Sequence, residues 1–266
     1  MPELPEVEVV KKSLENKLKN LTIRKVSISN NKLRYKIDKK QFVKIKNQKI
    51  ISIQRRSKYL IINLNKNYTI LAHLGMTGKF FIIDNNKKHK TSFYYSLKKN
   101  DTKHDHITFI FDKKIKLVYN DVRKFGFIKV FPTKDVFNCS HLVSLGPEPL
   151  SKDFNVEYFK KYILNKKIKI KDLLMDQKFI AGLGNIYCNE ILFSCKINPV
   201  RRVKNINKIE IEKIIEFTEK ILKEAILQGG SSIKNFSSVE GQSGNYQQKF
   251  NVYGREKASC NRHKCL

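Results

Sequence analysis

The chain begins with MPELPEVE at residues 1–8, a stretch with two prolines and three carboxylates in an otherwise strongly basic sequence. Pro5 suits the first turn of a helix, and Glu6 and Glu8 suit the positive end of the helix dipole. Apolar residues continue at helical spacing as Val7, Val10, Leu14 and Leu18. The opening therefore predicts the start of a helix.

The same stretch also fits a nucleophile. A small residue at position 2 is compatible with removal of Met1, which leaves Pro2 with a free, exposed secondary amine. An α-amino group titrates near pH ~8, so a useful fraction is neutral at pH 7. Addition of this amine to a carbonyl-like carbon gives an iminium, whose charge acidifies the neighbouring C–H and eases elimination. Glu3 and Glu6 are close enough in sequence to move protons, and a helix start would fix the amine in place.

Composition indicates a polyanionic partner. The 266 residues carry 54 Lys and Arg against 24 Asp and Glu, which gives a formal charge of +30. Such an excess points most simply to nucleic acid. Only nine of the 54 are Arg, and Asn and Ile are abundant, as an AT-rich genome would impose on any protein. We attribute part of the charge to function and part to this bias.

The chain lacks the marks of a membrane or secreted protein. No apolar run reaches ~18 residues, and the acidic opening does not fit a signal peptide. Five cysteines at irregular spacing favour a reduced cytoplasmic chain over a disulfide framework. The length suggests about two domains.

Apolar patterning predicts an α+β protein. Between residues 22 and 131, short runs rich in Ile, Phe, Tyr or Val predict the strands of a sandwich or barrel. These are Thr22–Ser29, Ile50–Gln54, Tyr59–Leu64, Thr69–Leu74, Lys79–Ile83, His106–Phe111, Ile115–Tyr119 and Phe127–Phe131. Helical spacing then predicts Asp153–Leu164, Ile168–Met175, Asn185–Lys196 and Asn207–Gln228. We expect a β domain at 1–135, a linker at 136–152, a helical domain at 153–230 and a tail at 231–266.

Two turn tips and one basic segment beside a strand carry candidate DNA contacts. QRRSKYL at 54–60 is either an edge strand protected by charge or a phosphate contact in which Lys58 also transfers protons. Met76 lies between two glycines at a turn tip, although methionine usually fills cores. Arg123 and Phe125 lie at a second tip. Proteins that evict a base from DNA need apolar wedges and a filler, so these three residues predict such a set.

A glycine-containing hairpin at 179–187 leads into a predicted helix. Gly182 and Gly184 permit close backbone approach, and free N–H groups at a helix N-terminus bind phosphate well. A plain connector between helices explains the same pattern. Asn185 fits an N-cap or an amide contact to phosphate.

Together these motifs resemble the formamidopyrimidine-DNA glycosylase family. The opening, QRRSKYL, HLGMTG, DVRKFG, LGPEPL, GLGNIYCNEILF and QGGSS followed by VYGRE occur in the family's order from residue 1 to about 256. The resemblance implies an N-terminal β-sandwich with a leading helix, a helix–two-turn–helix domain and a zinc finger. It also implies excision of oxidised purines from double-stranded DNA followed by strand cleavage.

The resemblance assigns roles to matching positions. Pro2 would form a Schiff base at the sugar C1′, Glu3 would protonate the sugar, Glu6 would support them, and Lys58 would contact phosphate and assist β-elimination. The residues filling the gap left by the flipped base would be Met76, Arg123 and Phe125. The residues holding the DNA backbone would be His104, Arg123, Lys166, Lys171 and Asn185. Ser231–Tyr246 would close over the damaged base, and the protein would be a monomer on the bacterial nucleoid.

The sequence departs from the family at its zinc finger. The family uses four cysteines and an Arg at the finger tip, which assists the last elimination. Here Cys260 matches the first ligand, and His263 and Cys265 follow before Leu266. A structural zinc site needs four ligands, so we expect Zn²⁺ binding to be impaired. A truncated or frameshifted gene would explain the pattern, and so would a degraded enzyme in a shrinking genome.

Three functions compete on this sequence. The first is a bifunctional DNA glycosylase and AP lyase, with δ-elimination in doubt. The second is a remnant that binds lesions or abasic sites with little turnover, because the finger is incomplete. The third is a basic RNA- or ribosome-associated protein, which only the charge supports. The purine-lesion branch fits better than the pyrimidine-lesion branch because of the opening and the two tips.

Overall fold

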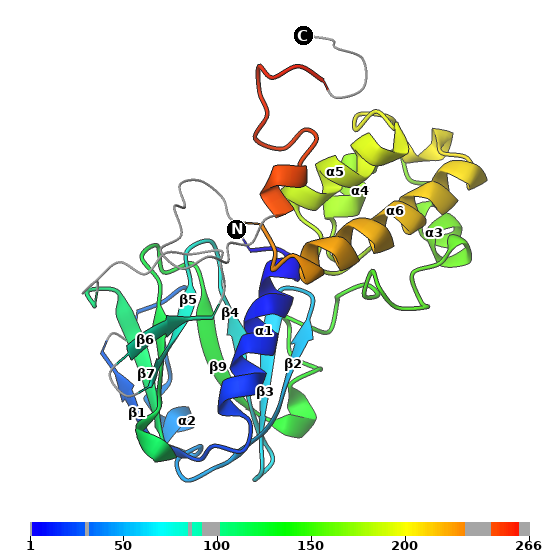
Figure 1. Cartoon of the computed structure of the whole chain (residues 1–266). Helices are drawn as coiled ribbons and strands as arrows, with labels where there is room; N and C mark the ends of the chain where they lie inside the picture. Colours follow the sequence, from blue (N-terminus) through cyan, green and yellow to red (C-terminus); the bar gives the residue numbers. More distant parts are fainter. Residues whose placement is uncertain (1, 30–31, 85–86, 92–101, 232–245, 261–266) are drawn as a thin grey trace.

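The computed structural model describes residues 2–29, 32–84, 87–91, 102–231 and 246–260. A β-sandwich with a helix along its side forms one lobe, and a group of helices forms the other (Figure 1). The structure confirms the predicted α+β class, with the sandwich first and the helical lobe second.

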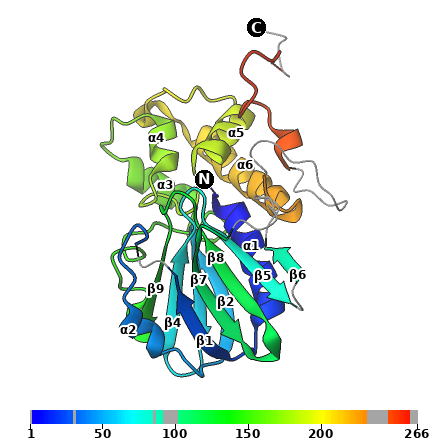
Figure 2. The same ribbon diagram turned by 90° about the vertical axis from the view of Figure 1, so that its left-hand side faces the viewer.

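The sandwich consists of two antiparallel sheets. The five-stranded sheet has the order β1 (Ile23–Ile28), β7 (Asp105–Phe111), β8 (Lys116–Asn120), β5 (Lys79–Asp84) and β6 (Lys87–Lys90). The four-stranded sheet has the order β2 (Ile50–Arg56), β3 (Tyr59–Leu64), β4 (Tyr68–His73) and β9 (Phe127–Pro132). The two layers face each other in Figure 2. All eight strand runs expected from the sequence are present, with ends that differ by at most two residues.

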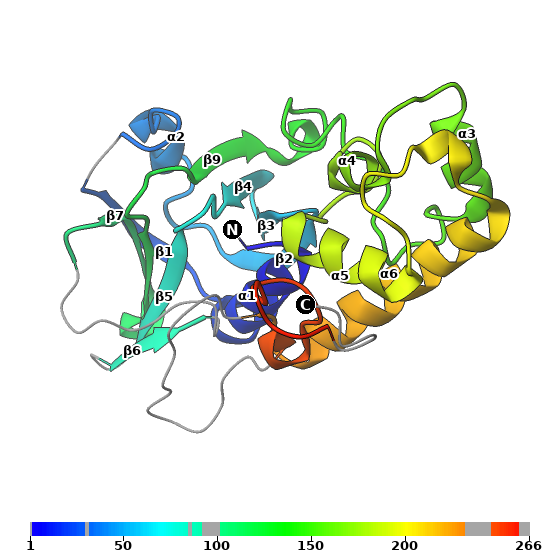
Figure 3. The same ribbon diagram turned by 90° about the horizontal axis from the view of Figure 1, so that it is seen from above.

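Helix α1 (Leu4–Leu18) links the two lobes. Val7, Val10, Leu14 and Leu18 are buried in the sandwich core, which confirms the apolar stripe predicted from their spacing. Leu4 instead belongs to the core of the helical lobe. The first turn of α1 therefore lies at the junction, as the view from above also shows (Figure 3).

The helical lobe contains α3 (Val156–Ile163), α4 (Ile170–Met175), α5 (Asn185–Cys195) and α6 (Lys208–Leu227). Each lies inside a helix expected from the sequence. Asn155 caps α3 by accepting the Tyr158 N–H at 2.9 Å, and Asn207 accepts the Glu210 N–H at 2.9 Å at the start of α6. The helices bury a shared core that includes Phe179, whose ring lies 4.9 Å from that of Phe159.

Two elements were not expected. Helix α2 (Lys39–Val43) has five residues, too few to show a helical period, and depends on Asp38, which accepts the Lys40 N–H at 3.0 Å. Strand β6 has the sequence KKHK and no apolar alternation, because it is a charged edge strand. Short 3-10 turns occur at Asp112–Lys114, Thr133–Asp135, Val203–Asn205 and Tyr246–Lys249.

In the described ranges, no helix is both long and apolar enough to cross a lipid bilayer.

The position of Leu4 makes a test of the link between the lobes. Its side chain is fully buried among residues of the helical lobe, so Leu4→Ala should lower the free energy of unfolding by about 2–5 kcal/mol. Leu164→Ala is the matched control, because Leu164 is 70 % exposed, and it should cost less than about 0.5 kcal/mol. Urea denaturation measures both, and equal effects would contradict a buried anchor at residue 4.

Candidate active site

The Glu3 carboxylate sits on the N-terminus of α5. Its two oxygens accept the N–H groups of Gly184 at 2.7 Å and Ile186 at 2.8 Å, with the Tyr187 N–H at 3.4 Å. A helix N-terminus has unsatisfied N–H groups and a positive dipole end, which favour an anion. A Cβ on Gly184 would lie 2.5 Å from the Glu3 carboxyl carbon, so glycine is required for this approach.

This contact corrects two expectations. The N-cap of α5 is Gly184 and Asn185 is the first helical residue, exposed to solvent. The N–H groups that the sequence offered to a DNA phosphate are occupied by Glu3. The carboxylate comes from 181 residues earlier in the chain, so it supplies the cap that Asn185 was expected to provide.

Burial changes the proton affinity of Glu3. The residue is 3 % exposed, and loss of solvent raises its pKa from 4.5 to about 7. The Lys58 ammonium and the N–H groups of Ile186 and Tyr187 oppose this rise, while the Glu6 carboxylate adds to it. A carboxyl that titrates near neutral pH is suited to giving and taking a proton.

Lys58 lies in the same buried region. It is 6 % exposed, and desolvation lowers its pKa, although the negative charges of Glu3 and Glu6 oppose the change. Among the described residues no carboxylate lies within ion-pair distance of its ammonium group. Lys58 is therefore a buried cation available to a ligand.

Glu6 acts as a hub. One oxygen accepts the Glu3 N–H at 2.9 Å. The other accepts the Tyr187 hydroxyl at 2.7 Å and both the N–H and the hydroxyl of Ser231, at 2.8 and 2.9 Å. Glu6 thus joins α1, α5 and the segment after α6. These contacts fix the opening of the chain rather than leave the carboxylate free.

Pro2 is buried, whereas the sequence predicted an exposed nitrogen. The docking of Glu3 and Leu4 draws the opening of the chain into the junction between the lobes. The translated chain also carries Met1 on this nitrogen, so it is an amide there. An amine at Pro2 exists only after Met1 is removed.

Two glycine-containing tips meet beside the sandwich. A Cβ on Gly75 would lie 2.5 Å from the Gly126 nitrogen. Asp121 is fully buried and accepts the Thr77 hydroxyl at 2.5 Å and the Gly126 N–H at 2.8 Å. Thr77 in turn accepts the Arg123 N–H at 3.0 Å. Asp121 therefore holds the tips side by side, a role that the sequence did not reveal.

The tips bring together the three residues expected to fill a base gap. Met76 and Phe125 are 39 % and 45 % exposed, and the Arg123 guanidinium lies 4.5 Å from the centre of the Phe125 ring. All three line a hollow of about 550 Å³, together with His73 and Arg34. Burial lowers the His73 pKa to about 4, with help from the positive charges of Lys58 and Arg34, so its ring is neutral at pH 7.

Shared residues connect three hollows along this face. The first, about 330 Å³, is lined by Glu3, Lys58, Asn185 and Tyr253 among others. The second, about 450 Å³, shares Lys58 with the first and His73 with the hollow of the tips. The three hollows are therefore neighbours, with the Glu3 carboxyl in the first and Met76 in the hollow of the tips.

The remaining expected DNA contacts lie apart from these hollows. His104, Lys166 and Lys171 are half-buried and are not among the described residues that line the three hollows. The Lys166 ammonium lies 4.5 Å from the centre of the Tyr162 ring. The segment expected to close over the base lies outside the described residues, except for Ser231 and Tyr246.

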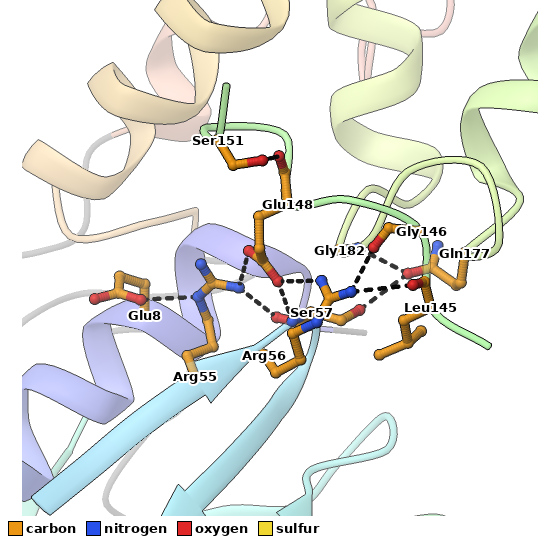
Figure 4. Close-up of polar contacts among 10 residues, drawn as sticks. All are labelled: Glu8, Arg55, Arg56, Ser57, Leu145, Gly146, Glu148, Ser151, Gln177 and Gly182. Atoms are coloured by element: carbon orange, nitrogen blue, oxygen red, sulfur yellow. Dashed lines mark hydrogen bonds and ion pairs between the residues drawn. The ribbon is translucent and has the colours of Figure 1, made fainter. Parts of the chain in front are cut away.

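Arg55 and Arg56 differ from both interpretations of QRRSKYL. They are neither a solvated edge nor open to phosphate, because their guanidinium groups form ion pairs with Glu8 and Glu148 (Figure 4). Only Lys58 of the three cations faces a hollow.

Several residues around the Glu3 hollow were missed from the sequence. Gln177 and Met175 line this hollow, and so does Tyr253, whose motif VYGRE was noted only as an approach to the finger. Glu190, fully within α5, accepts the N–H groups of Val252 and Tyr253 at 3.0 and 2.9 Å. No local pattern marks such long-range acceptors.

The zinc ligands cannot be assembled from the described residues. Cys260 lies within them, whereas His263 and Cys265 lie outside. Within the described ranges no three His, Cys, Asp or Glu side chains come close enough to hold a metal ion. The family is known for zinc, and of the three candidate ligands the described part of this chain contains Cys260.

Comparison with known proteins gives consistent matches. The formamidopyrimidine-DNA glycosylase N-terminal domain matches residues 1–128, and the H2TH domain of the same family matches residues 145–237. A formamidopyrimidine-DNA glycosylase of Rickettsia bellii is 40 % identical over 260 residues, which cover 98 % of this chain and 90 % of the relative. One of Wolbachia pipientis is 37 % identical, with coverage of 98 % and 91 %.

Solved structures of proteins from the same family also match this chain. A Lactococcus lactis Fpg bound to DNA with an abasic site matches with a TM-score of 0.84 and 32 % identity, covering 98 % of this chain and 91 % of the other. A mutant of the L. lactis protein in complex with Fapy-dG DNA matches with a TM-score of 0.85 and 32 % identity, covering 98 % and 92 %.

The family models, the relatives and the solved structures together place this two-lobed chain among the DNA glycosylases that act in DNA repair. The chain belongs to the formamidopyrimidine-DNA glycosylase family, whose members are DNA glycosylases with AP lyase activity.

The raised Glu3 pKa predicts a pH-dependent stability. Its proton is bound more tightly in the folded state, so the stabilising contribution is complete below pH 4.5 and is lost as pH rises through about 7. Relative to Glu3→Gln, the wild-type protein should therefore lose stability between these pH values and show no further change above about pH 8. Thermal denaturation of both proteins from pH 4 to 9 measures the difference. A difference that is flat with pH would contradict the raised pKa.

Proposed function

We propose that this chain excises oxidised purines, such as 8-oxoguanine and formamidopyrimidines, from double-stranded DNA and then cleaves the strand at the abasic site. The observation that carries the proposal is the Glu3 carboxyl at the α5 N-terminus, next to the buried Lys58 and at the opening of the chain. The Fapy-dG and abasic-site DNA in the complexes of the similar L. lactis Fpg support this substrate class.

In the proposed reaction, removal of Met1 frees the Pro2 nitrogen. This nitrogen forms a bond to C1′ of the damaged nucleotide while the bond from C1′ to the base breaks, and the base leaves with a proton. Glu3 donates a proton to the ring oxygen of the sugar, which opens the ring and leaves an iminium between Pro2 and C1′. The raised pKa of Glu3 keeps this proton available near neutral pH.

The iminium then promotes strand cleavage. Its positive charge acidifies C2′, the Glu3 carboxylate left by the previous step takes the C2′ proton, and the bond between C3′ and its phosphate oxygen breaks, so that the phosphate leaves with the bonding electron pair. In the proposal Lys58 binds the phosphate and assists this β-elimination, because it is a buried cation with a lowered pKa. Water finally releases Pro2 from the sugar fragment.

The tips supply recognition in the same proposal. Met76, Arg123 and Phe125 line one hollow and would fill the stack when the damaged nucleotide leaves it. His104, Lys166, Lys171 and Asn185 would contact the backbone around the site. The net charge of +30 favours association with a DNA duplex, and we propose that a monomer acts on the bacterial nucleoid. In this proposal residues 1–135 and 153–230 form the two domains of the enzyme.

Borohydride trapping tests the covalent step. Protein from which Met1 has been removed should form a reduced, covalent complex with a duplex that contains one 8-oxoguanine, and the mass of the N-terminal peptide should place the adduct on Pro2. Pro2→Gly should slow strand cleavage at least about hundredfold and retain much of the DNA affinity. The same protein with Met1 retained is the matched control and should not be trapped. Absence of trapping by the processed protein, or an adduct elsewhere, would sink the proposal.

The wedge role has its own test. Loss of a stacked aromatic contact costs roughly 1–3 kcal/mol, so Phe125→Ala should weaken binding to lesion DNA by about fivefold to about 150-fold. Phe137→Ala is the control, because Phe137 is also exposed, at 53 %, and lies outside the hollow of the tips. Fluorescence anisotropy with an 8-oxoguanine duplex measures both variants. Equal affinities for the two would remove Phe125 from the recognition set.

A further inference from the structure

The Glu148 carboxylate binds three consecutive residues of the hairpin that presents Lys58. One oxygen accepts the Arg56 guanidinium at 2.8 Å and the Ser57 N–H at 2.7 Å, and the other accepts the Arg55 guanidinium at 2.7 Å. Figure 4 shows Glu148 between the two arginines, with Glu8 of α1 on the far side of Arg55. Hydrogen bonds between charged groups are stronger than neutral ones and fix geometry more closely.

The turn held by Glu148 has a demanding backbone. Strand β2 ends at Arg56 and β3 begins at Tyr59, so Ser57 and Lys58 form a two-residue hairpin loop. Ser57 has a φ of +55°, a conformation that favours glycine and persists in other residues only when the surroundings fix it. The surroundings do so here. The Ser57 N–H goes to Glu148, its carbonyl accepts Arg55 at 3.0 Å, and its hydroxyl donates to Gln177 at 3.2 Å.

Glu148 belongs to a segment, residues 145–148, that is connected by hydrogen bonds to the loop beside the Glu3 hollow. Arg56 donates to the carbonyl groups of Leu145 and Gly146 at 3.1 and 2.5 Å. The Gly146 N–H donates to the Gln177 carbonyl at 2.9 Å. A Cβ on Gly146 would lie 2.5 Å from the carbonyl oxygens of Lys178 and Phe179, so the segment packs directly on that loop.

Gln177 continues the connection to α5. Its side-chain oxygen accepts the Gly182 N–H at 2.8 Å, and its side-chain nitrogen donates to the Leu183 carbonyl at 2.7 Å. The next residue, Gly184, gives its N–H to Glu3. A continuous set of hydrogen bonds therefore runs from the Lys58 hairpin through residues 145–148 to the helix end that holds Glu3.

We propose that Glu148 is a positioning residue for Lys58. Its carboxylate fixes the Ser57–Lys58 turn and places that turn at a set position relative to the Glu3 carboxyl. This role rests on the proposed function, in which Lys58 and Glu3 act on one nucleotide. An ordinary ion pair would only add stability. A positioning residue acts through Lys58, so its effect on the reaction must depend on Lys58 being present.

A double-mutant cycle separates the two roles. We expect Glu148→Gln to slow single-turnover cleavage of an 8-oxoguanine duplex by about ten- to hundredfold, as small displacements of a catalytic group do. In a Lys58→Ala background the same change should have less than about a twofold effect. Glu210→Gln is the matched control, because Glu210 has a similar side-chain exposure, 20 % against 23 %, and its ion pair with Arg201 lies at α6. It should change cleavage less than about twofold.

Each outcome is decisive. If the effects of Glu148→Gln and Lys58→Ala on the cleavage rate simply multiply in the double variant, the positioning role is wrong. It is also wrong if Glu148→Gln cleaves at the wild-type rate. An inactive, untrapped wild-type protein would instead defeat the proposed function itself. A Lys58→Ala protein with unchanged cleavage removes the role of Lys58 and the positioning role with it. If Glu148→Gln does not fold, Arg56→Lys takes its place, since lysine keeps the charge but not the fork that reaches both Glu148 and the carbonyl groups.

Discussion

The contact between the Glu3 carboxylate and the first N–H groups of α5 organises this molecule. It joins the start of α1, in the sandwich lobe, to the start of α5, in the helical lobe, and both partners of the contact are buried there. Leu4 enters the helical core beside it, and Gly182 leaves room, since a Cβ there would lie 2.7 Å from the Leu4 side chain. Glu6 adds bonds to Tyr187 and Ser231. The site exists because two lobes close around one short peptide.

The buried position of Glu3 has opposing effects on its pKa. Burial favours the neutral carboxyl, while the helix end and Lys58 favour the carboxylate. Burial is the largest effect, and the pKa of Glu3 rises to about 7. Lys58 is shifted in the opposite direction by the same desolvation. The two shifts bring the proton affinities of Glu3 and Lys58 closer together, as suits a pair of groups that move protons.

The sequence was informative where the signal is local. Strands such as Tyr59–Leu64 were found because their apolar content is dense, and α1 was found from Pro5 and the spacing of Val7 to Leu18. The sequence predicts one tip from Met76 between two glycines and the other from Arg123 close to Phe125, and the structure brings the two tips into one hollow. Strand β6 escaped because it is charged throughout.

Hydrogen-bond acceptors that lie far away in the sequence cannot be predicted from local patterns. Glu3 capping a helix 181 residues away, and Glu148 binding Ser57 across 91 residues, depend on how the lobes meet. For that reason the sequence leaves the helix N-terminus at residues 179–187 open between a phosphate site and a plain connector, and it predicts a linker at Gly146–Pro149 without showing that Glu148 binds Arg55 and Arg56. The burial of Pro2 has the same origin, because nothing in the first eight residues reveals the lobe that receives them.

The central claim is that burial outweighs the helix end and makes Glu3 a proton carrier near neutral pH. The most direct measurement is a ¹³C NMR titration of the protein labelled at its glutamate carboxyl carbons, with Glu3→Gln identifying the Glu3 resonance. The account predicts a midpoint near pH 7. A midpoint near the ordinary value of 4.5 would show that the N–H groups of α5 and Lys58 keep the carboxylate ionised, and would contradict it.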